Sequence, residues 1–135
     1  MPGPLNIFQV SGRAMSAQLV RMNTTASNLA NASAVATTED AAYRTMKPVF
    51  RTSFDRASGL ATVDVAQVVT AGENPTKRYD PGNPMADGEG NVWDSAVDES
   101  RELVDMMEAA RGYQNNVEVM STAKTLITET LRLGR

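Results

Sequence analysis

The chain contains neither cysteine nor histidine. Without these side chains it forms no disulfide, no thiolate metal site and no histidine-based acid–base pair. It also contains no run of eighteen apolar residues, so we predict no segment that crosses a membrane. Its net charge of -3 argues against nonspecific nucleic-acid binding, which normally needs a basic surface. These absences remove the commonest catalytic and nucleic-acid-binding chemistries.

Two further absences concern the N-terminal region. No basic segment followed by an apolar one is visible, so we expect any export to leave the chain uncleaved. No aspartate or glutamate occurs before Glu39, and the only charges there are Arg13 and Arg21. Uncharged polar residues take their place, whereas an exposed helix normally carries mixed charges. Because burying charges is costly, this composition favours a surface that is covered in an assembly.

Apolar residues recur at alternating steps of four and three near both ends of the chain. This spacing places them along one side of an α-helix, and a sustained seven-residue repeat is typical of a coiled-coil seam. The N-terminal stripe consists of Phe8, Gly12, Met15, Leu19, Met22, Ala26 and Leu29. The C-terminal stripe consists of Leu103, Met106, Ala110, Tyr113, Val117, Met120, Lys124, Ile127 and Leu131. We therefore predict two long terminal helices that pair along these stripes, which indicates a role in assembly.

The residues between the stripes lack this period. Two β-branched and aromatic runs, 46–54 and 60–70, flank a turn sequence that ends in Gly59, which predicts a β-hairpin. Residues 71–96 are rich in turn-forming residues, which favours an extended loop with short strands. The predicted fold class is mainly α: a coiled-coil core made by the terminal helices, with a small hairpin-and-loop insert. The predicted division is 1–33 for the N-terminal helix, 34–96 for the insert and 97–135 for the C-terminal helix.

Three short sequences, in order along the chain, resemble motifs of one family. Residues 27–31 (SNLAN) are similar to the asparagine-containing motif of the flagellar axial proteins, the rod, hook and hook-associated proteins. Residues 110–119 (ARGYQNNVEV) look like the A-x-R-x-Y-Q-x-N sequence near the C-termini of that family. Residues 79–92 resemble the Y-x-P-G-x-P-x-A-D-x-x-G-x-V stretch of its proximal-rod members. The resemblance covers essentially the whole chain, although residues 98–103 are more charged than the family pattern.

The resemblance implies a structural subunit of the proximal rod of the bacterial flagellar basal body, where the rod crosses the periplasm. It implies that copies of the chain and other rod proteins pack together and carry torque from the rotor to the hook. It also implies export through the flagellar type III apparatus. Two alternatives stay open, namely another rod subunit of the same family and a coiled-coil adaptor that does not polymerise.

The predicted functional residues form an assembly interface. No catalytic, cofactor-binding or metal-binding residue is predicted, and we expect no enzymatic activity, small-molecule substrate, nucleic-acid partner or membrane insertion. Asn28 and Asn31 are included because their amides can bind backbone groups, and Arg111 and Tyr113 because both types are enriched in interface hot spots. The full set is Phe8, Met15, Leu19, Met22, Asn28, Leu29, Asn31, Leu103, Met106, Ala110, Arg111, Tyr113, Val117, Met120, Ile127 and Leu131.

Overall fold

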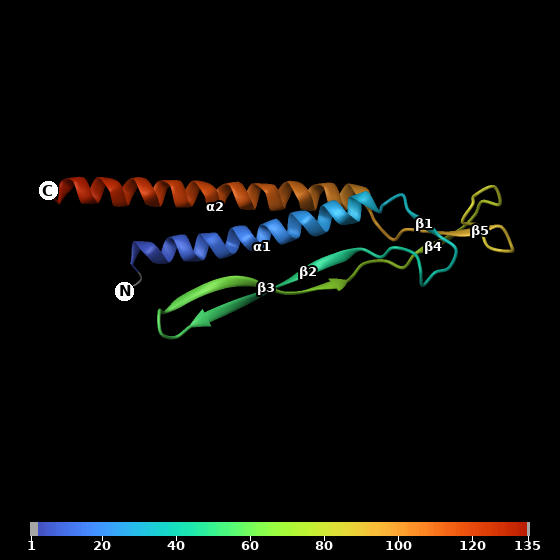
Figure 1. The fold of residues 1–135 in the computed structure, drawn as a ribbon, viewed down its shortest axis with the longest axis horizontal. Coiled ribbons are helices and arrows are strands. Elements are labelled where there is room, and N and C mark those ends of the chain that lie inside the picture. Colours follow the sequence, from blue (N-terminus) through green and yellow to red (C-terminus); the bar gives the residue numbers. More distant parts are fainter. Residues whose placement is uncertain (1–2, 135) are drawn as a thin grey trace.

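The computed structural model describes residues 3–134 and shows an elongated molecule built in layers (Figure 1). The C-terminal helix α2, Glu99–Leu133, lies beside the N-terminal helix α1, Pro4–Ala30, and the two run antiparallel. A β-hairpin lies along the other side of α1. A small sheet forms the end that is remote from the start of α1 and the end of α2. The helices and the hairpin therefore share one long axis.

The two helices differ in how well their ends are stabilised. The Asp98 carboxylate accepts a hydrogen bond from the Arg101 N–H at 3.2 Å and caps the first turn of α2. Acids occupy that first turn and Arg132 lies in the last one, which matches the helix dipole. α1 has no side-chain cap and no acid in its first turn. α1 therefore depends more strongly on its packing partners.

The hairpin consists of β2, Met46–Asp55, and β3, Leu60–Thr70, which pair antiparallel. Asp55 organises the turn because its carboxylate accepts a hydrogen bond from the Ser58 hydroxyl at 2.7 Å. Gly59 follows with φ of 68°, a left-handed conformation that glycine adopts at little cost. The pairing register shifts between positions 49 and 50, which marks an irregularity of the kind that bends and twists a hairpin.

The second sheet has three short antiparallel strands. Their order is β1, Val35–Ala36, then β5, Asn91–Asp94, then β4, Thr76–Tyr79. Val92 in the central strand β5 is fully buried. β1 adds only two residues, and Ala36 pairs with Trp93 far along the chain. This sheet thus joins the segment after α1 to the segment before α2.

The predicted mainly-α fold class is wrong. The chain is 46% helix and 24% strand, and the strands form two separate sheets. The hairpin strands of 10 and 11 residues run beside α1 as a layer of their own rather than as a small insert (Figure 1). The terminal helices do pair, but one of them also carries a sheet. The architecture is therefore mixed α and β, and no coiled coil stands alone as the core.

α1 is the middle layer, and the hairpin packs on one side of it. The Arg13 guanidinium donates hydrogen bonds to the Asp64 carboxylate at 3.1 Å and to the Thr62 hydroxyl at 3.3 Å, both on β3. Ala17, one turn further along α1, is buried. Leu60 at the start of β3 is buried as well and shares a hollow with Val10. The side of α1 that carries positions 10, 13 and 17 thus faces the hairpin.

Small and polar side chains make the contact between α1 and α2. The Arg21 guanidinium donates a hydrogen bond to the Asp105 carboxylate at 3.3 Å. Gln18 lies so close to Gly112 that a Cβ atom at the glycine would stand 3.1 Å from the glutamine side chain. The contact positions of α1 bond to α2, approach it closely or line a hollow with it, and they are Ile7, Ser11, Gln18, Arg21 and Asn28. The corresponding positions of α2 are Glu102, Asp105, Ala109, Gly112, Asn116, Val119 and Ala123, of which Ala109 is fully buried.

The layers enclose little buried volume. Val92 and Asn28 are the largest side chains that are completely buried within residues 3–134. Among the same residues seven hydrophobic side chains are buried, and five of them are alanine. Across the same residues, no helix combines the length and the apolar character needed to cross a membrane. The fold is therefore held by extended contacts between layers rather than by one deep core.

Candidate assembly interface

On each helix, the predicted apolar stripe is displaced by one residue from the contact positions that face the other helix. In α1, the predicted positions 8, 12, 19, 22 and 29 each follow a contact position by one residue. One residue corresponds to a rotation of about 100° around a helix. In an antiparallel pair the same forward step rotates both stripes toward the same side of the pair. The hairpin lies on the opposite side, because its partners on α1 precede the contact positions by one residue.

We call the surface that carries these stripes the open side of the helix pair. Its residues are Phe8, Met15, Leu19, Met22 and Leu29 of α1 and Leu103, Met106, Ala110, Tyr113, Val117, Met120, Ile127 and Leu131 of α2. Leu19 is 47% exposed, Leu103 53%, Val117 43% and Leu131 69%. The others are half-buried. Large apolar side chains therefore stand on the surface along both helices, whereas Ala109 and Ala123 are buried between the helices.

Three predicted residues lie elsewhere. Asn28 is buried, and Asn31 is half-buried and donates a hydrogen bond to the Ser27 carbonyl of its own helix at 2.8 Å. Arg111 is exposed, and it lies two residues from Tyr113 on α2. Residues two apart on a helix do not face the same way. The structure therefore does not bring Arg111 and Tyr113 together as the predicted anchor pair.

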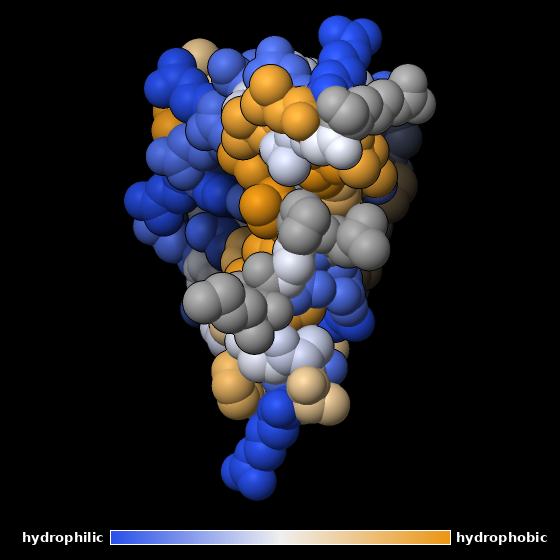
Figure 2. Space-filling view, turned by 90° about the vertical axis from the view of Figure 1, so that its left-hand side faces the viewer, coloured by the Kyte–Doolittle hydropathy of each residue, from blue (hydrophilic) through white to orange (hydrophobic). Residues whose placement is uncertain are grey.

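The open side continues into an apolar surface at the end where α1 begins and α2 ends (Figure 2). Ile127 and Leu131 line a shallow hollow there with Ile7, Ala123 and Leu126. Ile7 is 44% exposed and Leu126 is 59% exposed. Neither residue belongs to the predicted stripes, because each lies outside their alternating spacing. In the sequence, only their apolar character could have marked these two residues as part of an interface.

A buried polar junction lies at the other end of the helix pair. Asn28 is 1% exposed and Glu102 is 2% exposed. The Asn28 amide nitrogen donates hydrogen bonds to the Glu102 carboxylate at 2.9 Å and to the Met46 carbonyl at 2.8 Å. Its amide oxygen accepts hydrogen bonds from the Met46 N–H at 3.0 Å and the Tyr43 hydroxyl at 2.8 Å. Because both the donor and the acceptor of Asn28 are paired, the junction is stable although it is buried.

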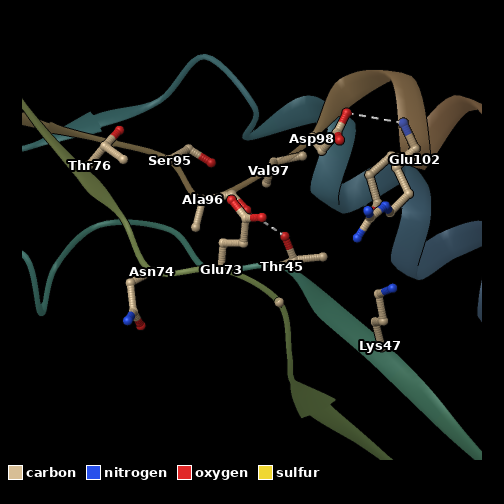
Figure 3. A pocket seen from close by; sticks show the side chains of 12 residues that line it. Thr45, Lys47, Glu73, Asn74, Thr76, Ser95, Ala96, Val97, Asp98 and Glu102 are labelled. Atoms are coloured by element: carbon tan, nitrogen blue, oxygen red, sulfur yellow. Dashed lines mark hydrogen bonds between the residues drawn. The ribbon is translucent and has the colours of Figure 1, made fainter.

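Beside this junction the structure opens a hollow of about 210 Å³ (Figure 3). The Thr45 hydroxyl donates a hydrogen bond to the Ala96 carbonyl at 2.9 Å and so joins the segment before β2 to the segment before α2. Lys47, Glu73 and Glu102 also line the hollow. Charges of both signs surround it, so its electrostatics favour no single class of ligand. Sequence reasoning did not find Glu102 as a functional residue, since one acid in a first helical turn is common.

Comparison with known proteins gives matches along nearly the whole chain. The family model described as flagella basal body rod protein matches residues 8–36, and the model described as flagellar basal body rod FlgEFG protein C-terminal matches residues 89–133. The flagellar basal-body rod protein FlgC of Salmonella typhimurium is 44% identical over 133 residues, covering 97% of this chain and 98% of the relative. FlgC of Escherichia coli O157:H7 is 41% identical over 131 residues, with the same coverage. FlgC of Yersinia enterocolitica is 40% identical, again with the same coverage.

A layered, elongated chain with these matches is a flagellar basal-body rod protein. Within that class, the chain belongs to the FlgC family. The resemblance to flagellar axial proteins is thereby confirmed, together with the structural role and the place in the basal-body rod that it implied.

Proposed function

We propose that this rod subunit builds the proximal rod by packing the open side of its helix pair against neighbouring subunits. Those neighbours are other copies of the chain and other rod proteins. The observation that carries the proposal is the one-residue displacement of the apolar stripes. It leaves large side chains of both helices, among them Leu19 and Val117, exposed on one side of the pair.

The energetics favour covering this surface. Fully burying one large apolar side chain contributes roughly 1.5–3 kcal/mol, and Leu19, Leu103, Val117 and Leu131 are each about half exposed or more in the single chain. A contiguous apolar surface of this kind marks an interaction site rather than an ordinary solvated face. The open side also runs along both helices, so one neighbour can contact α1 and α2 together.

The terminal helices and the insert have different roles in this proposal. We propose that residues 1–33 and 97–135 form the part that packs into the rod, and that the insert, residues 34–96, braces adjacent subunits. Torque passes from rotor to hook through such packed interfaces, and the long axis shared by helices and hairpin supports this role. Export through the flagellar type III apparatus is also proposed, and it is supported by family membership alone. The proposal assigns the chain no enzymatic activity.

The test introduces a charge on each face of the helix pair. Met22→Glu and Val117→Glu place carboxylates on the open side, where burial of an unpaired charge is prohibitive. We expect both variants to abolish rod formation in purified basal bodies and swimming motility.

Val104→Glu is the matched control. Val104 is 54% exposed and apolar, but it precedes the contact residue Asp105 and so lies on the other side of α2 from the open side. Rods and motility should persist in this variant. Normal rods built from Met22→Glu or Val117→Glu subunits would refute the assignment of the open side.

A further inference from the structure

Asn28 occupies a place where four chain segments meet. It lies near the end of α1, contacts Glu102 in the first turn of α2, contacts Met46 at the first residue of β2, and accepts a hydrogen bond from Tyr43 in the preceding loop. Within residues 3–134, these are the side-chain hydrogen bonds that join both helices to the insert at one point.

The geometry at Met46 imitates strand pairing. The Asn28 side chain donates to the Met46 carbonyl at 2.8 Å and accepts from the Met46 N–H at 3.0 Å. A neighbouring β-strand would satisfy the same two backbone groups in the same way. The amide side chain offers a donor and an acceptor side by side, whereas an ionised aspartate has no donor and leucine has neither group.

The other contacts near this point join parts of the insert to each other. The Ala96 N–H donates to the Tyr43 carbonyl at 3.0 Å, and the Ser95 N–H donates to the Ala34 carbonyl at 3.2 Å. These bonds hold the outgoing and returning segments side by side. Neither bond involves a residue of α1 or α2.

We infer that Asn28, with Glu102 and Tyr43, is a joint that fixes the direction of the distal sheet of β1, β4 and β5 relative to the helix pair. Asn28 is the positioning residue, because its amide contacts α2, β2 and the loop together. Its loss releases the distal sheet from the helices while each part keeps its own hydrogen bonds. The joint goes beyond the open side, which lies on a different surface of the helices.

The experiment measures the distance between the insert and the helices in the purified chain. The natural chain has no cysteine, so spin labels attach only at introduced sites. Glu89→Cys labels the loop of the distal sheet and Ser121→Cys labels α2, and both positions are exposed. Pulsed electron paramagnetic resonance then gives the distribution of distances between the two labels.

Asn28→Leu should broaden this distribution about twofold, because it removes four hydrogen bonds and leaves the Met46 N–H and carbonyl unpaired. Tyr43→Phe removes one hydroxyl and should broaden it less. Asn31→Leu is the matched control, since Asn31 is the same residue type three positions on and its side chain bonds to the Ser27 carbonyl of α1. Its distribution should equal that of the parent chain.

Each outcome decides the question. A distribution in Asn28→Leu as narrow as in the parent overturns the joint, and so does a parent distribution that is already broad. Equal broadening in Asn31→Leu overturns it too. If circular dichroism shows that Asn28→Leu has lost its helices, Tyr43→Phe decides, and an unchanged distribution in that variant contradicts the inference. The label distances do not depend on the proposed function, so the joint and the proposed packing of the open side can fail separately.

Discussion

Asp87 holds the loop between β4 and β5 in shape. Its carboxylate accepts hydrogen bonds from the backbone N–H groups of Asn91 and Glu89, each at 2.9 Å. The bond from Asn91 above all keeps the pKa of Asp87 below the ordinary value of an aspartate. A carboxyl whose pKa is lowered by folding stabilises the fold above its unfolded pKa of about 3.9 and loses that contribution as the pH falls through the lowered value.

We therefore expect the loop to be insensitive to pH from 7 down to about 5, and to open only below about pH 4. The Asn91 amide chemical shift, followed by NMR during an acid titration, measures this. Asp87→Asn keeps an oxygen acceptor but cannot titrate, so its Asn91 shift should stay flat over the acid range. A midpoint at or above the ordinary aspartate pKa in the parent chain would contradict the assignment.

At the scale of elements, the helix pair is defined by which residues come between the helices. Ala109 is fully buried at the contact, whereas Ala110 lies on the open side and is half-buried. The helices approach closely around Ala109 and Gly112 because these residues have little or no side chain. Larger residues at these positions would push the helices apart.

Ala109→Leu should lower the free energy of unfolding by about 1–3 kcal/mol, because the added atoms have no space. Ala110→Leu should change it by less than about 0.5 kcal/mol, because its side chain faces away from α1. Urea unfolding followed by circular dichroism compares these two neighbouring substitutions. A larger loss of stability in Ala110→Leu than in Ala109→Leu would mean that the predicted apolar stripe, and not the contact positions, lies between the helices.

The helices and the hairpin could be predicted because their signals are local. The seven-residue repeat indicated both helices, and Gly59 after a turn sequence indicated the hairpin. β1 could not be predicted, because two residues carry no periodicity and Ala36 finds its partner Trp93 only in the folded chain. The open side could be listed from hydrophobicity, and its role as an interface stays a prediction. The contact stripe could not be listed, because Ser11, Ala109 and Gly112 approach through small size rather than through hydrophobicity.

As a whole, the molecule has long layers and few deeply buried side chains. Beyond Ala123, which lies near Ile7, α2 continues to Leu133 while α1 approaches its start. The last turns of α2 therefore have little of the chain to pack against. Leu131 and Leu133, 69% and 88% exposed, lie in this segment.

We expect the isolated chain to be marginally stable, with a free energy of unfolding at or below about 5 kcal/mol, the low end for folded domains. Amide hydrogen exchange should be fast in the last turns of α2 in the free chain and markedly slower in purified rods, because neighbours cover these turns there. Comparison of the two samples by mass spectrometry measures the difference. Equal protection in both would mean that assembly leaves this segment uncovered.

The open side also has a chemical consequence. Four of the eight methionines of the chain, Met15, Met22, Met106 and Met120, stand on it. Oxidation adds an oxygen to the thioether sulfur and turns a flexible apolar side chain into a polar one. All four are half-buried in the single chain, and the proposed packing of the open side requires that they react more slowly with oxidants in rods than in the free chain. A sulfoxide at one of these positions should therefore weaken the packing proposed for the open side.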